Sequence, residues 1–509
     1  MIARLFGLSG PTLDVAAVFA SRMGGIVVSL IFIPIYTRLL SPAQFGVIAL
    51  LLSLQAFFLV SDLGLATVLA RDTAIARGDP AALAAATYDR RRGELVMAGF
   101  VLLVAAAALA GVELRGEAGV LEDVGRVVAA TALIALLVLL NVSQLCLNAL
   151  GHYRLTGALT TIGTIVRAAV SAIVIARVSA SVDAFLWSQL VVAALHYAVA
   201  RAALDRRSGA VPHRLAPLLD GPALLQLLVR CKPVMIYTLA AAAALNLDKS
   251  ILAAFLPIQL TGLYFLAATY AMVPIGLLSG PLNQYFSPRV AHAEANGDQA
   301  ARWQLATTFQ LLLMPAVILP AVILIRQAPL LIPLWLHAAP GVPQVTALAT
   351  ILLGGTAIGA TGYYPTTFLI AVADNGFLAR LSAVSAVIVL AVATAWAAAG
   401  SLEGVAASYA VFHALGCIAQ WWRLRQHWRS AAFRTFVLVC YFLPAGALLL
   451  ACFIGWALAA IILTNGTTTG WFCIALEPVL QLLLGGGVLA IISRWCYLRG
   501  ASLHHAAIS

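Results

Sequence analysis

Three cations lie inside long apolar stretches of this 509-residue sequence: Arg22, Arg167 and Lys249. A charged side chain at the centre of a bilayer costs about 2.5–3.5 kcal/mol on insertion scales, so such residues usually mark a polar path. Arginine suits phosphate, because its planar guanidinium donates two hydrogen bonds and keeps its charge when desolvated. The first hypothesis is a membrane cavity that handles an anion. The alternative is an internal pair, for example between Arg22 and Asp14 or Asp62.

The cleanest pattern is a polar stripe around Arg167. Thr160, Thr164, Arg167 and Ser171 follow the spacing i, i+4, i+7, i+11, which places them on one face of a helix. We expect this face to line the cavity. In the alternative, the hydroxyls bond to their own helix and Arg167 holds a neighbouring helix.

Two further groups could contact a sugar. Asn141, Gln144 and Asn148 share one helical face and could bond either sugar hydroxyls or another helix. Tyr363 and Tyr364 could offer rings and hydroxyls to a glycan, although paired tyrosines also pack helices together.

Two acids are candidates for coupling or charge pairing. Asp248 precedes Lys249, and neighbours in a helix lie about 100° apart, so the two need not pair. Lys249 is then a cargo contact, whereas Asp248 has a coupling or an architectural role. Asp62 lies in apolar surroundings, where an acid can exchange a proton. Its alternative partner is Arg22 or Arg167.

The amino-acid composition indicates that the segments carrying these residues lie in a membrane. Hydrophobic residues make up 63% of the chain and charged residues only 10%, against about 25% in soluble domains. We therefore predict an all-α polytopic membrane protein with about fourteen transmembrane helices. They are expected at 14–38, 44–70, 93–111, 126–150, 157–177, 182–203, 231–256, 260–286, 304–325, 344–371, 376–398, 403–423, 434–462 and 471–498.

The charges predict the orientation. Most of the 30 Lys and Arg residues fall in alternate loops, which places both termini in the cytoplasm. The net charge of +11 is dispersed over these loops and so does not indicate nucleic acid. The longest outer loop is expected at 327–343 and is too short for a soluble catalytic domain. All seven cysteines lie in or beside apolar segments, and neither a metal site, a nucleotide-binding loop nor a cofactor is expected.

A weak internal repeat divides the chain. The segment around Gly46 resembles the segment around Gly262, and Gly78 and Gly297 each precede an aspartate further on. Both copies run in the same direction, which indicates parallel repeats about an axis along the membrane normal. We predict an N-terminal lobe at 1–203, a cytoplasmic linker at 204–230, a C-terminal lobe at 231–430 and a C-terminal extension at 431–509. The linker carries an amphipathic helix that begins after Asp220, with leucines that face lipid.

Several segments resemble polysaccharide-unit (Wzx-type) flippases of the multidrug/oligosaccharidyl-lipid/polysaccharide (MOP) exporter superfamily. They are YTRLLSPAQFG after the first predicted helix, DLGL in the second, RCKP, and NLDKSILAAFLPIQLTGLYFLA. The resemblance implies two pseudo-symmetric six-helix lobes and two extra C-terminal helices around a central cavity in a bacterial inner membrane. It implies a cargo of undecaprenyl-diphosphate-linked oligosaccharide, moved by alternating access for O-antigen or exopolysaccharide assembly. Membrane lipids, a polysaccharide polymerase and a chain-length regulator are the other implied partners.

Other functions stay open. A lipid II flippase is disfavoured by SRMGG in the first helix, where we associate an Arg-Asp pair with that subfamily. A drug antiporter of the same superfamily is disfavoured by the buried arginines. A membrane glycosyltransferase or polysaccharide polymerase would need a larger outer loop, so we expect a transporter and no enzyme.

Overall fold

The computed structural model is helical throughout the residues that it describes. These are 10–61, 64–115, 124–208, 220–275, 286–287, 289–294, 296–337, 339, 341–428, 430–465, 476–489 and 491–492. Within them, ten helices are long and apolar enough to cross a membrane, and Met23–Leu39 and Leu476–Leu489 are shorter apolar helices. The prediction of an all-α, multi-pass membrane protein is confirmed, whereas the count of fourteen stays a prediction.

Contacts between residues divide the chain into two compact units. Unit 1 is Met1–Phe265 with Ala386–Ser401, and unit 2 is Leu266–Ser385 with Leu402–Ser509. The predicted lobes at 1–203 and 231–430, the linker at 204–230 and the extension at 431–509 stay a prediction.

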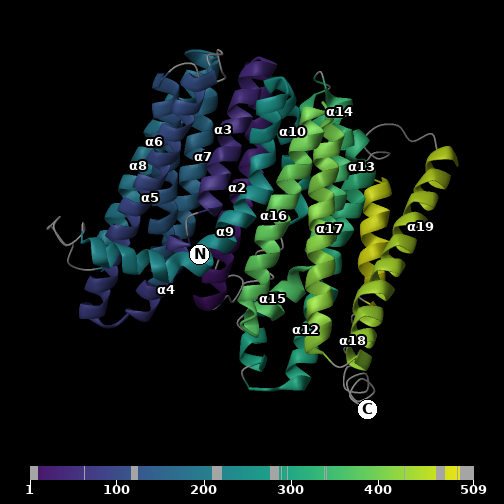
Figure 1. Ribbon diagram of the computed structural model, residues 1–509. Coiled ribbons are helices and arrows are strands. Elements are labelled where there is room, and N and C mark those ends of the chain that lie inside the picture. The colour runs from purple at the N-terminus through teal and green to yellow at the C-terminus, as the bar shows by residue number, and fades with distance from the viewer. Residues whose placement is uncertain are drawn as a thin grey trace. The chain divides into compact units, whose positions relative to one another are not determined.

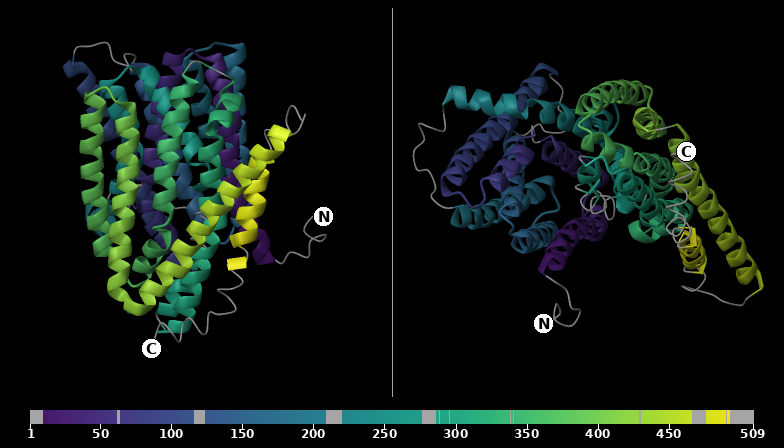
Figure 2. Two further views of the ribbon diagram at one scale, coloured as in Figure 1. Left: turned by 90° about the vertical axis from the view of Figure 1, so that its right-hand side faces the viewer. Right: turned by 90° about the horizontal axis from the view of Figure 1, so that it is seen from below.

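Unit 1 is built around α7, which packs between α2 and α8, while α6 packs against α8, α5 and α4. Figure 1 shows these helices, and the view from below in Figure 2 shows several of them nearly end-on (purple to blue). Its helices are α2 (Gly10–Leu39), α3 (Pro42–Val60), α4 (Leu65–Ile75), α5 (Pro80–Arg115), α6 (Val124–Ala149), α7 (Tyr153–Arg177), α8 (Val182–Ser208), α9 (Gly221–Phe255) and the first part of α10 (Ile258–Ala271).

The predicted helix at 44–70 is two helices. Ser41 caps the start of α3, where its hydroxyl accepts a hydrogen bond from the amide of Gln44. The helix ends at Ser61, and α4 begins after Gly64, whose φ of 69° favours glycine. Asp62 falls in this break and lies outside the described residues.

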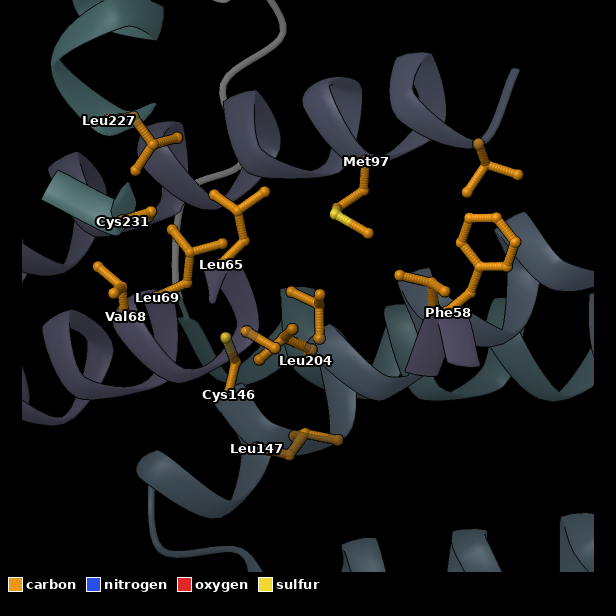
Figure 3. Close-up of a cluster of buried hydrophobic side chains, with 14 of the residues drawn as sticks. Phe58, Leu65, Val68, Leu69, Met97, Cys146, Leu147, Leu204, Leu227 and Cys231 are labelled. Carbon is orange, nitrogen blue, oxygen red and sulfur yellow. The ribbon is translucent and has the colours of Figure 1, made fainter. Parts of the chain in front are cut away.

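The linker also differs from the prediction. The amphipathic segment and the next predicted transmembrane helix form one helix, α9. Its Leu225 is exposed, but Leu227 and Cys231 are buried against Leu65 and Leu69 of α4. Figure 3 shows these side chains facing one another. The prediction that all the leucines of this segment face lipid is therefore wrong for Leu227, because α4 and α5 cover that side of α9.

A network of buried ion pairs joins α5 to α8. Asp205 accepts hydrogen bonds from Arg90 at 2.7 Å, Arg201 at 3.0 Å and Arg91 at 3.2 Å. Arg201 also pairs with Glu94. Arg90 is only 2% exposed, so its charge depends on the two acids for neutralisation.

The two glycines of the internal repeat lie in contact. A Cβ added to Gly46 would lie 2.1 Å from the carbonyl oxygen of Ile258, and one added to Gly262 would lie 3.3 Å from Cα of Gly46. The backbones of α3 and α10 therefore cross with no room for a side chain.

Replacement of Gly46 by alanine is expected to lower the free energy of unfolding by about 1–3 kcal/mol, because the new methyl group meets a backbone carbonyl that cannot rotate away. Thermal unfolding in detergent measures the change. The matched control is Gly25→Ala in α2, where nothing lies within 4 Å of the added Cβ. Equal unfolding temperatures for the two variants would contradict the close crossing.

In unit 2, α14 packs against both α13 and α17. Figure 2 shows the short yellow helix beside α19, where a Cβ on Gly455 would lie 3.1 Å from Gln481. The helices of this unit are α12 (Gln299–Leu313), η2 (Met314–Ile318), α13 (Leu319–Leu336), α14 (Val342–Ala360), α15 (Tyr363–Ala371), α17 (Leu402–His427), α18 (Ser430–Val437), η3 (Leu438–Phe442), α19 (Leu443–Asn465) and residues 476–489. Helix α16 (Asn375–Ala398) contributes to both units.

The predicted outer loop at 327–343 is wrong over most of its length. Helix α13 continues to Leu336 through Pro329 and Pro333. Apolar residues fill this stretch, and helices in membranes tolerate proline where neighbouring groups satisfy the freed carbonyls.

The turn between α15 and α16 predicts an acid-sensitive contribution to stability. Arg423 donates a hydrogen bond of 2.6 Å to Asp374, which lowers the pKa of that carboxyl. The contact therefore stabilises the protein at pH values above about 3.9, the ordinary pKa of an aspartate in the unfolded chain. This contribution is lost as the pH falls through the lower pKa that Asp374 has in the folded protein. Between pH 4 and pH 3, the unfolding temperature of wild type should fall more steeply than that of Asp374→Asn. Asp220→Asn, which alters an exposed acid that caps no amide, should behave as wild type does. Parallel curves for all three proteins would contradict this assignment.

Candidate functional site

Arg167 lies in the middle of α7 and is half-buried. Tyr36 of α2 and His196 of α8 lie within its electrostatic range. The hydroxyl of Tyr36 donates a 3.0 Å hydrogen bond to the carbonyl of Ala168, next to the arginine. No acid forms an ion pair with Arg167 in the part of the chain that the structure describes. A guanidinium, which stays charged when desolvated, therefore lies in the membrane-spanning part of unit 1.

Polar groups from three helices meet beside this cation. Gln144 of α6 lies 3.4 Å from Nε2 of His196. The histidine ring rests on Gly163 of α7, where an added Cβ would lie 2.2 Å from the ring. The glycine thus makes room for the imidazole one helical turn before Arg167. We call Tyr36, Gln144, Arg167 and His196 the Arg167 cluster.

The rest of the predicted stripe has mixed surroundings. The Thr160 hydroxyl donates to the Thr156 carbonyl of its own helix at 2.8 Å. Ser171 is fully buried, lies 2.8 Å from the Ser188 hydroxyl and accepts from Gln189 at 3.0 Å. These contacts favour helix packing for both residues. Thr164 is half-buried between them, so it stays a candidate cavity residue with Arg167.

The predicted amide face of α6 is divided as well. Gln144 belongs to the Arg167 cluster, whereas Asn141 and Asn148 are half-buried and make no side-chain hydrogen bond within the described residues. Oδ1 of Asn148 is buried without a partner there. A role for these amides in sugar binding stays a prediction.

Two of the predicted charges cannot be placed. Arg22 lies on α2, but its side chain is outside the described residues, and Asp62 is outside them altogether. Helix α2 packs along α7, where a Cβ on Gly24 would lie 3.4 Å from the methyl group of Thr161. The helices that carry Arg22 and Arg167 are therefore neighbours.

Lys249, unlike Arg167, has an acid partner among the described residues. Its Nζ lies 2.8 Å from a carboxylate oxygen of Asp248 and donates to the Leu245 carbonyl at 3.2 Å. The ring of Tyr264 lies 5.6 Å from the ammonium group. Helical spacing left the pairing of these adjacent residues open, and they pair because the long lysine side chain folds back along its own helix. Both residues are buried, which favours an architectural role.

Tyr364 lies in an aromatic cluster of unit 2. Its ring contacts those of Phe309, Phe368 and Phe436, and the residue is fully buried. Tyr363 packs at the edge of the same cluster. These contacts favour the packing alternative, and sugar binding by either tyrosine stays a prediction.

Sequence reasoning missed Tyr36 and His196. A single histidine in an apolar helix carries little information alone, and its meaning depends on Gly163 and Gln144 in other helices. The cluster combines a permanent cation with an imidazole, a phenol and an amide, so it can bind an anion with attached hydroxyl groups. In the described residues, no three His, Cys, Asp or Glu side chains gather as a metal site.

The family profile of the "Polysaccharide biosynthesis protein" family matches residues 35–337, which is more than half of the chain. The chain belongs to this polysaccharide biosynthesis protein family. The match includes α3 to α10, and therefore Arg167 and the Asp248–Lys249 pair. No curated protein matches the sequence.

Solved structures show which fold this family member has. "Lipid II flippase MurJ, inward closed conformation" is 12% identical, with a TM-score of 0.69 over 96% of this chain and 99% of that one. An outward-facing multidrug resistance MATE family transporter of the MOP superfamily is 14% identical, with a TM-score of 0.59 over 81% and 95%. A MOP superfamily transporter from Pyrococcus furiosus is 14% identical, with a TM-score of 0.57 over the same shares. This polysaccharide biosynthesis protein therefore has the MOP fold of flippases and transporters.

Proposed function

We propose that this protein is a flippase that moves undecaprenyl-diphosphate-linked oligosaccharide from the cytoplasmic to the periplasmic leaflet of a bacterial inner membrane. The observation that carries the proposal is Arg167, a cation in the membrane region without an acid partner among the described residues. A diphosphate is the anionic part of such a cargo, and a guanidinium can bind it through paired hydrogen bonds. The family match supports a role in polysaccharide synthesis.

In this mechanism the Arg167 cluster neutralises the diphosphate while the carrier crosses the membrane. Gln144 and His196 bond oxygen atoms of the phosphate or of the first sugar, and Thr164 extends the same face of α7. Arg22, on the neighbouring helix α2, is the second candidate cation for the diphosphate. The prenyl chain stays in lipid, because its transfer into a polar cavity would be unfavourable. Alternating access then carries the head group across, with both termini in the cytoplasm.

Asp248 and Lys249 hold α9 as a neutral pair in this proposal, and Asp62 is the candidate coupling acid. Asn141, Asn148, Ser171, Tyr363 and Tyr364 are secondary candidates for contact with the glycan. The product would serve O-antigen or exopolysaccharide assembly, with a polysaccharide polymerase and a chain-length regulator as downstream partners.

The extent of the structural matches favours a carrier-lipid cargo over a drug. The MurJ structure aligns with 96% of this chain and the MATE structures with about 80%, so the MurJ match includes more of the chain. Lipid II appears as a cargo only in the name of the MurJ structure. It is the second candidate cargo here because it also carries a polyprenyl diphosphate. A cationic drug fits a site built around an arginine poorly, because like charges repel in low dielectric.

A competition assay distinguishes these cargoes. Purified protein in liposomes is given a fluorescent undecaprenyl-diphosphate oligosaccharide, with unlabelled oligosaccharide lipid, lipid II or a cationic drug as competitor. The proposal predicts that unlabelled oligosaccharide lipid slows leaflet exchange most, lipid II less, and the drug not at all. Strongest competition by lipid II or by the drug would move the assignment to that cargo.

A further inference from the structure

The end of unit 1 where α4 and α6 finish carries cations that the flippase proposal does not use. The guanidinium of Arg77, in the turn after α4, lies against the turn between α6 and α7. A Cβ added to Gly151 of that turn would lie 2.9 Å from Nη1 and 3.0 Å from Nη2 of Arg77. Gly151 also has a φ of 85°, which favours glycine. The turn therefore holds the guanidinium in a space that any larger residue would fill.

A second guanidinium lies near the same turn. Partial burial lowers the pKa of His152, which follows Gly151, and the charges of Arg207 and Arg77 lower this pKa further. Both cations therefore lie within electrostatic range of the imidazole, although Arg207 comes from the end of α8. A 3.0 Å hydrogen bond to the carbonyl of Ala203 orients the Arg207 side chain. We call Arg77, His152 and Arg207 the Arg77 site.

The acids that α4, α5 and α8 carry at this end are engaged with other groups. Asp72 pairs with Arg71 at 3.0 Å and with Arg230 at 3.2 Å. Asp79 caps α5, because its Oδ1 accepts a backbone amide at 2.8 Å. Arginines of α5, α8 and α9 hold the remaining acids, which are Asp89, Glu94 and Asp205. Among the described residues no acid forms an ion pair with either arginine of the Arg77 site, so the site keeps a positive charge.

Exposed apolar side chains flank these cations. Ile75, two residues before Arg77, is 75% exposed, and Tyr153, which follows His152, is 38% exposed. Tyrosine is enriched where a membrane protein meets the boundary between lipid and water. The site thus combines positive charge with a surface that an acyl chain beside its head group can contact. A soluble anion would gain little from this apolar surface.

We infer that the Arg77 site binds the phosphate of an anionic phospholipid, which joins the ends of α4, α6 and α8. Arg77 and Arg207 bind the phosphate oxygens, and His152 donates a further hydrogen bond. The proposed orientation places this end at the cytoplasmic surface, where basic pockets between transmembrane helices bind anionic head groups. The phospholipid is a bound component of the protein and not its cargo, so the inference does not depend on which lipid is transported.

Native mass spectrometry of the full-length protein in detergent measures the binding of phosphatidylglycerol. Phosphatidylcholine and inorganic phosphate are the comparison probes. We expect phosphatidylglycerol to bind about tenfold more tightly than phosphatidylcholine, whose choline cation is repelled by the two arginines. Arg77→Gln and Arg207→Gln should each weaken the binding of phosphatidylglycerol about fivefold, and the double variant about 25-fold.

Arg71→Gln is the matched control. Arg71 is an exposed cation at the same end of unit 1, but it is already paired with Asp72. The variant removes the same charge, and its affinity for phosphatidylglycerol should stay at the wild-type value. Equal weakening by Arg71→Gln and Arg77→Gln would show that binding follows the general charge of this surface, which would overturn the site.

The other outcomes are equally decisive. Displacement of phosphatidylglycerol by inorganic phosphate at equal concentration would assign the site to a soluble anion and refute the lipid. Wild-type affinity in the double variant, at wild-type unfolding temperature, would remove Arg77 and Arg207 from lipid binding. Should Arg77→Gln fail to fold, Arg207→Gln and Arg77→Lys carry the test. Lysine keeps the charge but loses the paired donors, so Arg77→Lys should bind with intermediate affinity.

Discussion

Arg167→Gln is expected to slow exchange of the lipid-linked oligosaccharide by about 10- to 100-fold. A hydrogen bond to a charged group contributes about 1.5–3 kcal/mol, and each 1.4 kcal/mol corresponds to a factor of ten. Glutamine is a shorter, neutral side chain, so it removes the charge and the paired donors while remaining polar. The initial rate of leaflet exchange in liposomes measures the effect.

Two further variants separate charge from geometry. Arg167→Lys keeps the charge but loses the planar fork, so we expect an intermediate rate. Arg177→Gln removes an exposed cation at the end of the same helix and should leave the rate unchanged. All three variants should unfold near the wild-type temperature, because Arg167 has no acid partner among the described residues to lose. Equal rates for Arg167→Gln and wild type would remove Arg167 from the mechanism.

Asp205→Asn is expected to cost about 3 kcal/mol of stability, which is the largest single effect on folding that we predict. The variant leaves three arginines of the network, Arg90, Arg91 and Arg201, with only Glu94 to neutralise them. Removal of one partner from a buried ion pair typically costs about 3–5 kcal/mol, and Asp205 is partly accessible, which favours the lower value. Chemical or thermal unfolding in detergent measures this loss.

The Arg126–Asp183 pair provides the matched control for the network. Its two hydrogen bonds, of 2.8 and 2.9 Å, are comparable in length, but both side chains are more than one third exposed. Exposed pairs contribute about 0.2–1 kcal/mol, so Asp183→Asn should have a much smaller effect than Asp205→Asn. Similar losses in the two variants would show that burial of the network does not set its energy.

Much of the fold could be predicted because membrane helices depend on local composition. Long apolar runs identify α6, α7 and α8 to within a few residues. The failures have local causes that depend on tertiary contacts. Pro329 and Pro333 indicate a loop, but neighbouring helices keep α13 continuous to Leu336. The sequence predicts that Leu227 faces lipid, whereas in the structure this side chain is buried in a cluster with residues of α4.

The site was less predictable for the same reason. Helical spacing alone places Thr160, Thr164, Arg167 and Ser171 on one face of α7, and the role of that face as a cavity wall stays a prediction. The spacing does not indicate that Ser171 bonds Ser188 or that His196 rests on Gly163, because those partners come from α8. The pairing of Lys249 with Asp248 depends on a side-chain conformation that spacing does not specify.

The central claim is that this protein moves a polyprenyl-diphosphate oligosaccharide between leaflets, and the direct measurement is the initial exchange rate of that labelled lipid in liposomes. The label is placed on the glycan, and an impermeant quencher reports how much cargo remains in the outer leaflet over time. We predict exchange that increases in proportion to the amount of wild-type protein and exceeds that of protein-free liposomes. Exchange at the protein-free rate, with folded protein shown by its unfolding temperature, would contradict the claim.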